Sequence, residues 1–155
     1  LRVAGACRRE ELYNMAVEDI EDRGEFIFVK IPDTKTHIQR SFTITNIENE
    51  TIHYLEIFRK YFRLRPNHVK SSHLFLNYRA GKCTIQVLGK GTIGRWPSKI
   101  AEYLKLQNPA SYTGHAFRRI SATLLANKGV DVLGLKRHGG WKSSAVAESY
   151  VEDSL

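Results

Sequence analysis

One short stretch, Thr113-Gly114-His115-Ala116-Phe117-Arg118, carries residue types that could bind and act on a phosphate group. Helix positions three apart project from one face, so the imidazole of His115 and the guanidinium of Arg118 would be neighbours. A guanidinium binds phosphate oxygens bidentately, and an imidazole exchanges protons near neutral pH. By itself the pair also fits an ordinary solvated helix face. The apolar residues Phe117, Ile120 and Leu124 predict the face by which this helix docks.

Two further stretches could complete such a site. Arg8 shares a helical stripe with Leu12 and Met15. That stripe should face the core, so Arg8 either pairs with Glu11 or faces an anion. Near the other end, Gly139-Gly140-Trp141 precedes Tyr150 by nine residues. One continuous helix would place this tryptophan and tyrosine on opposite faces, whereas a turn after Trp141 would let them converge. Each could instead be a core aromatic residue.

Composition narrows the class of protein. The 155 residues include 24 Lys+Arg against 16 Asp+Glu, a formal net charge of +8 that attracts polyanions, nucleic acid first. With only two cysteines, a disulfide scaffold and a two-pair zinc ribbon are excluded, and a reducing compartment is favoured. We find no metal-ligand spacing, no apolar run long enough to span a membrane and no secretory signal, so we expect no metal, cofactor or membrane association.

The pattern of apolar residues predicts an α+β fold: one mainly helical domain with small antiparallel hairpins. Residues 89–94 match G-x-G-x-x-G, but a flexible basic loop is favoured over a nucleotide cradle. Leu1 to Ala4 already resemble the middle of a helix, so we expect a piece of a longer protein. The helices are predicted over residues 8–19, 49–64, 96–106, 115–127, 131–137 and a last one carrying Tyr150, and the strands over 25–31, 39–44, 73–78 and 83–88.

In chain order these motifs resemble the catalytic domain of the tyrosine recombinases, the phage-integrase family. The resemblance covers essentially the whole chain, residues 1–155. We therefore expect these residues to be a tyrosine recombinase catalytic domain, a fragment without the family's N-terminal DNA-clasping domain. The matching contexts are Cys7-Arg8-Arg9-Glu10-Glu11-Leu12, Asp33-Thr34-Lys35-Thr36, Thr113-Gly114-His115-Ala116-Phe117-Arg118-Arg119 and Gly140-Trp141 through Tyr150. Trp141 stands where many members have histidine, although tryptophan is an accepted variant at this position. Ile31 to Thr36 and Lys136 to Trp141 are most similar to Crypton-type eukaryotic recombinases.

The resemblance implies catalytic roles for Arg8, Lys35, His115, Arg118, Trp141 and Tyr150, with double-stranded DNA as the partner. Tyr150 would attack a phosphodiester, the two arginines and Trp141 would bind its oxygens, His115 would serve as base and Lys35 as acid. Lys30 competes with Lys35, and His138 with Trp141. Some remaining basic residues should contact phosphates, although a solvated surface role is more common for each: Arg2, Arg40, Arg59, Lys60, Arg63, Arg65, Lys90, Arg95, Lys105 and Arg137.

Two alternatives stay open. The fold could be a catalytically silent DNA- or protein-binding module of a larger nuclear regulator, or a relaxing topoisomerase with the same chemistry. The family acts as tetramers on paired sites, so a homo-oligomer is expected only in the full-length protein. A eukaryotic source would place the protein in the nucleus, and any other source in the cytoplasm.

Overall fold

The computed structural model describes residues 5–31, 39–48, 50–129, 131–140, 144, 145 and 148. Helices and two antiparallel sheets alternate along the chain, which confirms the predicted α+β fold. The helices are α1 (Arg9–Asn14), α2 (Tyr54–Arg63), α3 (Lys90–Tyr103), α4 (Gly114–Asn127) and α5 (Val132–Gly139), with short 3-10 turns η1 (Val17–Asp19) and η2 (Pro109–Ser111). The strands are β1 (Ile20–Asp22), β2 (Ile27–Ile31), β3 (Arg40–Ile44), β4 (Leu76–Arg79) and β5 (Lys82–Val87).

The larger sheet has the order β1-β2-β3, with Val29 opposite Phe42 in the β2–β3 pair. Along β2 the buried residues are Ile27, Val29 and Ile31, the alternation of a strand with one face on the core. This hairpin was predicted from its β-branched residues, whereas β1 was not. Strands β4 and β5 form the second predicted hairpin.

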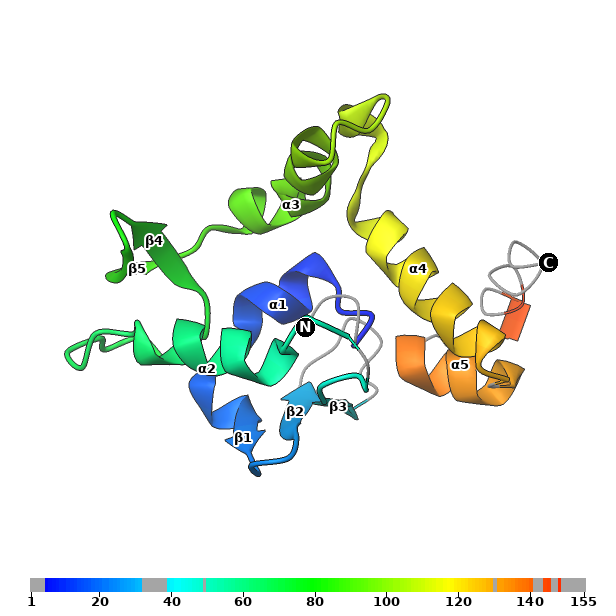
Figure 1. The fold of residues 1–155 in the computed structure, drawn as a ribbon, viewed down its shortest axis with the longest axis horizontal. Coiled ribbons are helices and arrows are strands. Elements are labelled where there is room, and N and C mark those ends of the chain that lie inside the picture. The colour runs from blue at the N-terminus through cyan, green and yellow to red at the C-terminus, as the bar shows by residue number, and fades with distance from the viewer. Residues whose placement is uncertain are drawn as a thin grey trace.

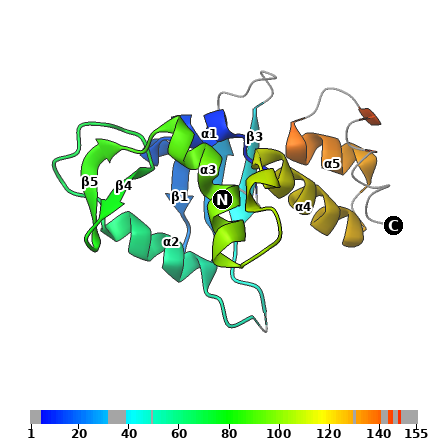
Figure 2. The same cartoon turned by 90° about the horizontal axis from the view of Figure 1, so that it is seen from above.

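Helix α1 lies at the centre of the molecule, with α2 and α3 on different sides of it (Figure 1). The β4–β5 hairpin and the α4–α5 pair lie at opposite ends, as a view from above also shows (Figure 2). The main core joins α1 to the larger sheet and to α3: Cys7, Leu12, Met15, Ile27, Val29, Ile31, Leu55, Leu74 and Ile93. The stripe predicted on α1 is therefore buried, and it holds Arg8 at the edge of the core.

Helix α3 begins six residues before its predicted start, so the interpretation of residues 89–94 as a flexible loop was wrong. Ile93 is fully buried in the core, and Gly94 lies against the side chain of Arg9. Burying an isoleucine contributes about 1.5–3 kcal/mol, which offsets the roughly 1 kcal/mol cost of a glycine in a helix. Pro97 consequently lies inside the helix instead of in its first turn.

The predicted docking face of α4 was also wrong. Ile120 and Leu124 are 46% and 50% exposed, whereas Arg118, Ser121 and Ala122 are buried. The buried face includes a charged residue because its guanidinium is hydrogen-bonded, as shown below.

Candidate active site

Arg8 immediately precedes α1 and is fixed by Glu11, one turn further along. The backbone N–H of Arg8 donates to Glu11 Oε2 at 2.7 Å, and its Nη1 donates to Oε1 at 2.9 Å. The Glu11 side chain is only 1% exposed, so this ion pair is not the surface pair that spacing alone would suggest. Arg8 lies at the edge of the core, and its side chain is 18% exposed to solvent.

Arg118 is held from two distant parts of the chain. Its Nη1 donates to the carbonyl oxygen of Ala6 at 2.6 Å, and its Nη2 donates to that of Gly139 at 3.0 Å. These bonds satisfy two of the five N–H donors that a guanidinium carries. His115 lies in the first turn of the same helix and is exposed.

These three predicted residues line one cleft of about 420 Å³, together with Arg9, Glu10, Gly94, Thr113 and Gly114. The cleft lies where α1, α3 and the N-terminus of α4 meet. Segments more than 100 residues apart in the sequence thus bring two arginines and a histidine to one hollow.

The cleft is positively charged. Three arginines line it against one acid, Glu10, and that carboxylate is itself engaged by Lys90 at 2.5 Å and Arg9 at 3.1 Å. The hydrogen bond from Lys90, then that from Arg9, lowers the pKa of Glu10, so the acid stays ionised and paired. The 14-residue helix α4 adds the positive end of its dipole at Thr113 and Gly114. The hollow therefore suits an anion.

The other predicted site residues divide into two groups. Lys35, Trp141 and Tyr150 lie outside the described residues. Lys30 is exposed on β2 and lines a different hollow of about 340 Å³. His138 bonds through Nε2 to Ser121 Oγ at 2.7 Å. Burial, and then the charges of Arg40 and Arg118, lower the pKa of His138 to about 4, which leaves a neutral ring inside the α4–α5 interface.

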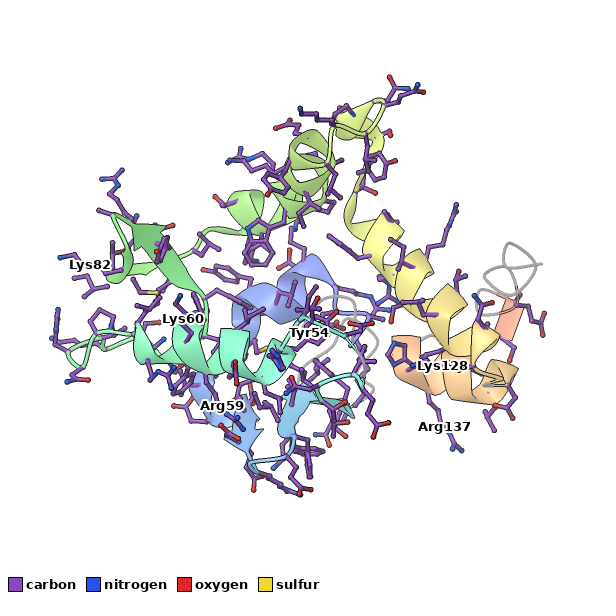
Figure 3. All side chains as sticks on the ribbon, in the orientation of Figure 1. Tyr54, Arg59, Lys60, Lys82, Lys128 and Arg137 are labelled. Carbon is purple, nitrogen blue, oxygen red and sulfur yellow. The ribbon has the colours of Figure 1, made fainter. Side chains whose placement is uncertain are left out.

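Arg40 corrects one sequence-based expectation. It was grouped with residues that could contact phosphates, yet its side chain is 6% exposed and its Nη2 lies 2.5 Å from Glu11 Oε2. No spacing signal links Arg40 to Glu11, because they are 29 residues apart. Arg59, labelled in Figure 3, likewise reaches from α2 to β1, where it pairs with Asp22 at 2.7 and 2.8 Å.

Within the described part of the chain, no His, Cys, Asp and Glu side chains cluster in a way that could hold a metal ion. Nor does any described helix combine the length and apolar character needed to cross a membrane.

Comparison with solved structures gives the same fold. A crystal structure of XerA recombinase matches with a TM-score of 0.73 at 20% identity, over 96% of this chain and 48% of that chain. XerH recombinase, bound to its palindromic difH substrate in a post-cleavage complex, matches with a TM-score of 0.74 at 18% identity, over 99% and 40%. The Tn1549 transposon integrase, in complex with a circular intermediate DNA, matches with a TM-score of 0.62 at 21% identity, over 96% of this chain and 51% of that chain.

The chain thus spans about half or less of the length of these structures. A search of curated protein sequences finds no match. The model of the phage integrase family matches residues 1–154, which is nearly the whole sequence. A match of this extent, on this fold and around this cationic cleft, shows that the chain belongs to the phage integrase family.

Proposed function

We propose that this chain is the catalytic domain of an enzyme that cuts and rejoins DNA strands through a 3′-phosphotyrosine, in site-specific recombination or the integration of a mobile element. The observation that carries the proposal is the cleft in which Arg8, His115 and Arg118 meet. Solved structures with the same fold include recombinases bound to DNA substrates, which supports double-stranded DNA as the partner.

In the proposed reaction the phenol oxygen of Tyr150 forms a bond to the scissile phosphorus while the bond from phosphorus to the 5′-oxygen breaks. The products are a 3′-phosphotyrosine and a free 5′-hydroxyl. A 5′-hydroxyl of another strand then attacks the phosphotyrosine, and the tyrosine is released. Covalent catalysis replaces one difficult displacement by two matched ones, and the phosphotyrosine conserves the energy of the broken bond.

The cationic cleft supplies what this transition state needs. Negative charge concentrates on the non-bridging phosphate oxygens, and the guanidiniums of Arg8 and Arg118 bind such oxygens with fixed geometry. The indole N–H of Trp141 is proposed as a further donor. Preorganised donors of this kind typically contribute about 3–4 kcal/mol each to the transition state.

Two proton transfers complete the step. His115 is exposed in the cleft and is proposed to accept the phenol proton, which free tyrosine releases only near pH 10. Lys35 is proposed to protonate the departing 5′-oxygen, with Lys30 as the competing acid. Lys30 lines a separate hollow from Arg8, His115 and Arg118, which counts against Lys30 as the acid.

The finer assignments extend the same proposal. The resemblance of Ile31 to Thr36 and of Lys136 to Trp141 to Crypton-type recombinases favours a eukaryotic mobile element and a nuclear location. A tetramer on paired DNA sites is the proposed assembly of the full-length protein.

The decisive experiment traps the covalent intermediate. Genomic fragments from the source organism are lightly nicked, so that cleavage beside a nick releases a short oligonucleotide and prevents rejoining. The full-length protein should form a DNA adduct that survives denaturant, and Tyr150→Phe should form none. Tyr103→Phe is the matched control, because Tyr103 is 87% exposed at the end of α3.

Binding without any adduct in the wild type would contradict the proposal and leave a silent DNA-binding module as the function. The cleft lined by three arginines against one acid favours that second candidate over a protein-binding module without a DNA role, because such a lining attracts a polyanion. Relaxation of a plasmid that lacks any target site would instead indicate a topoisomerase.

A further inference from the structure

Arg40 joins three segments that are far apart in the sequence. From the first position of β3, its Nη1 donates to the carbonyl oxygens of Gly5 and, at 2.7 Å, His138, and its Nη2 donates to Glu11 Oε2 at 2.5 Å. The side chain is almost completely removed from solvent, with 6% exposed. A buried guanidinium of this kind is costly unless its charge is balanced, which the Glu11 carboxylate does here. Both Nη atoms are bonded, whereas the buried Nε has no hydrogen-bond partner among the described residues.

Arg118 bonds the same two segments as Arg40, the turn before α1 and the end of α5, at carbonyls one residue further along each. Arg40 bonds Gly5 and His138, and Arg118 bonds the next carbonyls, those of Ala6 and Gly139. Two guanidiniums therefore fasten the turn before α1 to the C-terminal end of α5. Cations at that end also interact favourably with the negative end of the helix dipole.

The turn before α1 shows independently that it is under constraint. Ala6 has a φ of 46°, in the left-handed region that residues with a Cβ rarely adopt, and it is fully buried. Such a conformation costs on the order of 1–3 kcal/mol and persists only where the surroundings fix it. The arginine bonds to Gly5 and Ala6 provide that fixation two to three residues before Arg8.

We infer that Arg40 is a positioning residue that aligns the catalytic groups of the cleft without lining it. Each segment it joins leads within a few residues to a group assigned to the reaction. Gly5 precedes Arg8 by three residues and His138 precedes Trp141 by three. Arg40 itself, paired with Ile31 across the β2–β3 hairpin, follows Lys35 by five. The inference rests on the proposed function and deepens it.

Arg40 acts most directly on Arg8, through the carboxylate of Glu11. Glu11 uses one carboxylate oxygen for Arg40 and the Arg8 backbone N–H, and the other for the Arg8 guanidinium. Removing the Arg40 guanidinium leaves Glu11 bonded to Arg8 without the contact that fixes it from β3. It also leaves Arg118 to hold the end of α5 to the turn without the two Arg40 bonds, which loosens both segments. A misplacement of about 1 Å in a catalytic group can cost on the order of 100-fold in rate.

The test uses Arg40→Lys, which keeps the charge opposite Glu11 but cannot reach three oxygens with one ammonium. Its matched control is Arg65→Lys, because Arg65 is half-buried and, like Arg40, bonds two backbone carbonyls, those of Ser71 and His73, which do not line the cleft. In the full-length protein we expect Arg40→Lys to bind the nicked duplex within threefold of wild type. Its single-turnover rate of adduct formation should fall on the order of 100-fold. Arg65→Lys should keep both the wild-type affinity for DNA and the wild-type rate of adduct formation.

Hydrogen exchange provides a readout that does not depend on activity. Arg40→Lys should exchange faster than wild type in residues 5–12 and in residues 132–140 together, while Arg65→Lys leaves both unchanged. If Arg40→Lys does not fold, Glu11→Asp replaces it, since the shorter carboxylate cannot serve both arginines and should give the same split between binding and cleavage.

The inference is overturned if Arg40→Lys forms the adduct at the wild-type rate, or if it loses DNA affinity as much as rate. It is also overturned if the rate of Arg65→Lys falls as far as that of Arg40→Lys. The proposed function stands in each of these cases. Absence of an adduct in the wild type would overturn the proposed function instead. In that case hydrogen exchange still tests the role of Arg40. Unchanged exchange of residues 5–12 and 132–140 in Arg40→Lys refutes that Arg40 holds these segments together, and faster exchange in both supports it.

Discussion

Replacement of Glu11 by glutamine is the sharpest test of how the cleft is built. Its carboxylate accepts three hydrogen bonds, at 2.5, 2.7 and 2.9 Å, from two arginines that flank it. The glutamine side chain has nearly the same shape but no charge, and its amide N–H₂ group must point toward one of the arginines. The change therefore leaves the buried cation of Arg40 beside the partly buried cation of Arg8 without their shared counter-ion.

The expected magnitude follows from the burial of the pair. Breaking a buried ion pair from one side costs about 3–5 kcal/mol, because an uncompensated charge remains inside the protein. In a domain of about this size each kcal/mol lowers the melting temperature by roughly 2–4 °C, so Glu11→Gln should lower it by about 6–20 °C.

Thermal denaturation followed by circular dichroism measures this effect. Glu21→Gln is the control, since Glu21 makes a two-pronged pair with Arg23 at 3.0 Å on the surface. Exposed pairs contribute little, so the control should melt within about 2 °C of wild type. Equal melting temperatures for the two variants would show that the buried network does not stabilise the fold as its geometry indicates.

Three further predictions follow from single positions. Gly5→Ala should destabilise the domain by about 1–3 kcal/mol in urea unfolding, because the new Cβ would lie 2.2 Å from the Phe42 ring, whereas Gly91→Ala, inside α3 with open space around it, should not. The pKa of His138, lowered to about 4 by burial and two arginines, makes stability fall with decreasing pH between about 6.5 and 4, since only the unfolded state takes up the proton there. That loss is on the order of 2 kcal/mol after allowance for partial screening, and a flat stability profile for the wild type, matching that of His138→Gln, would contradict it. Burial raises the pKa of Cys7 to about 11, so a thiol reagent at pH 8 should label it only after denaturation. Labelling is followed in Cys83→Ser, which removes the other free cysteine, and labelling of that variant in its native state would refute this.

The β2–β3 and β4–β5 hairpins, unlike strand β1, were predictable because their signal is local. Alternating apolar residues at Ile27, Val29 and Ile31 produce a strand wherever one face meets a core, and the predicted returning strand forms from residue 40. The start of α3 was not predictable in this way. Its glycines are poor helix formers, and the burial of Ile93 in the core that α3 shares with α1 offsets their cost.

In the candidate site, too, some features follow from local sequence and others only from tertiary contacts. The sequence alone determined that Arg8, His115 and Arg118 belong to one set, because the kinds of residue and their local contexts resemble one family. Only the tertiary structure decided how they are held. Arg40 and Arg118 can be buried because carbonyls of residues 5–6 and 138–139, and the Glu11 carboxylate, meet them there. A charge becomes tolerable inside a protein only when partners from elsewhere in the chain arrive at hydrogen-bond distance, and no local sequence pattern encodes that arrival.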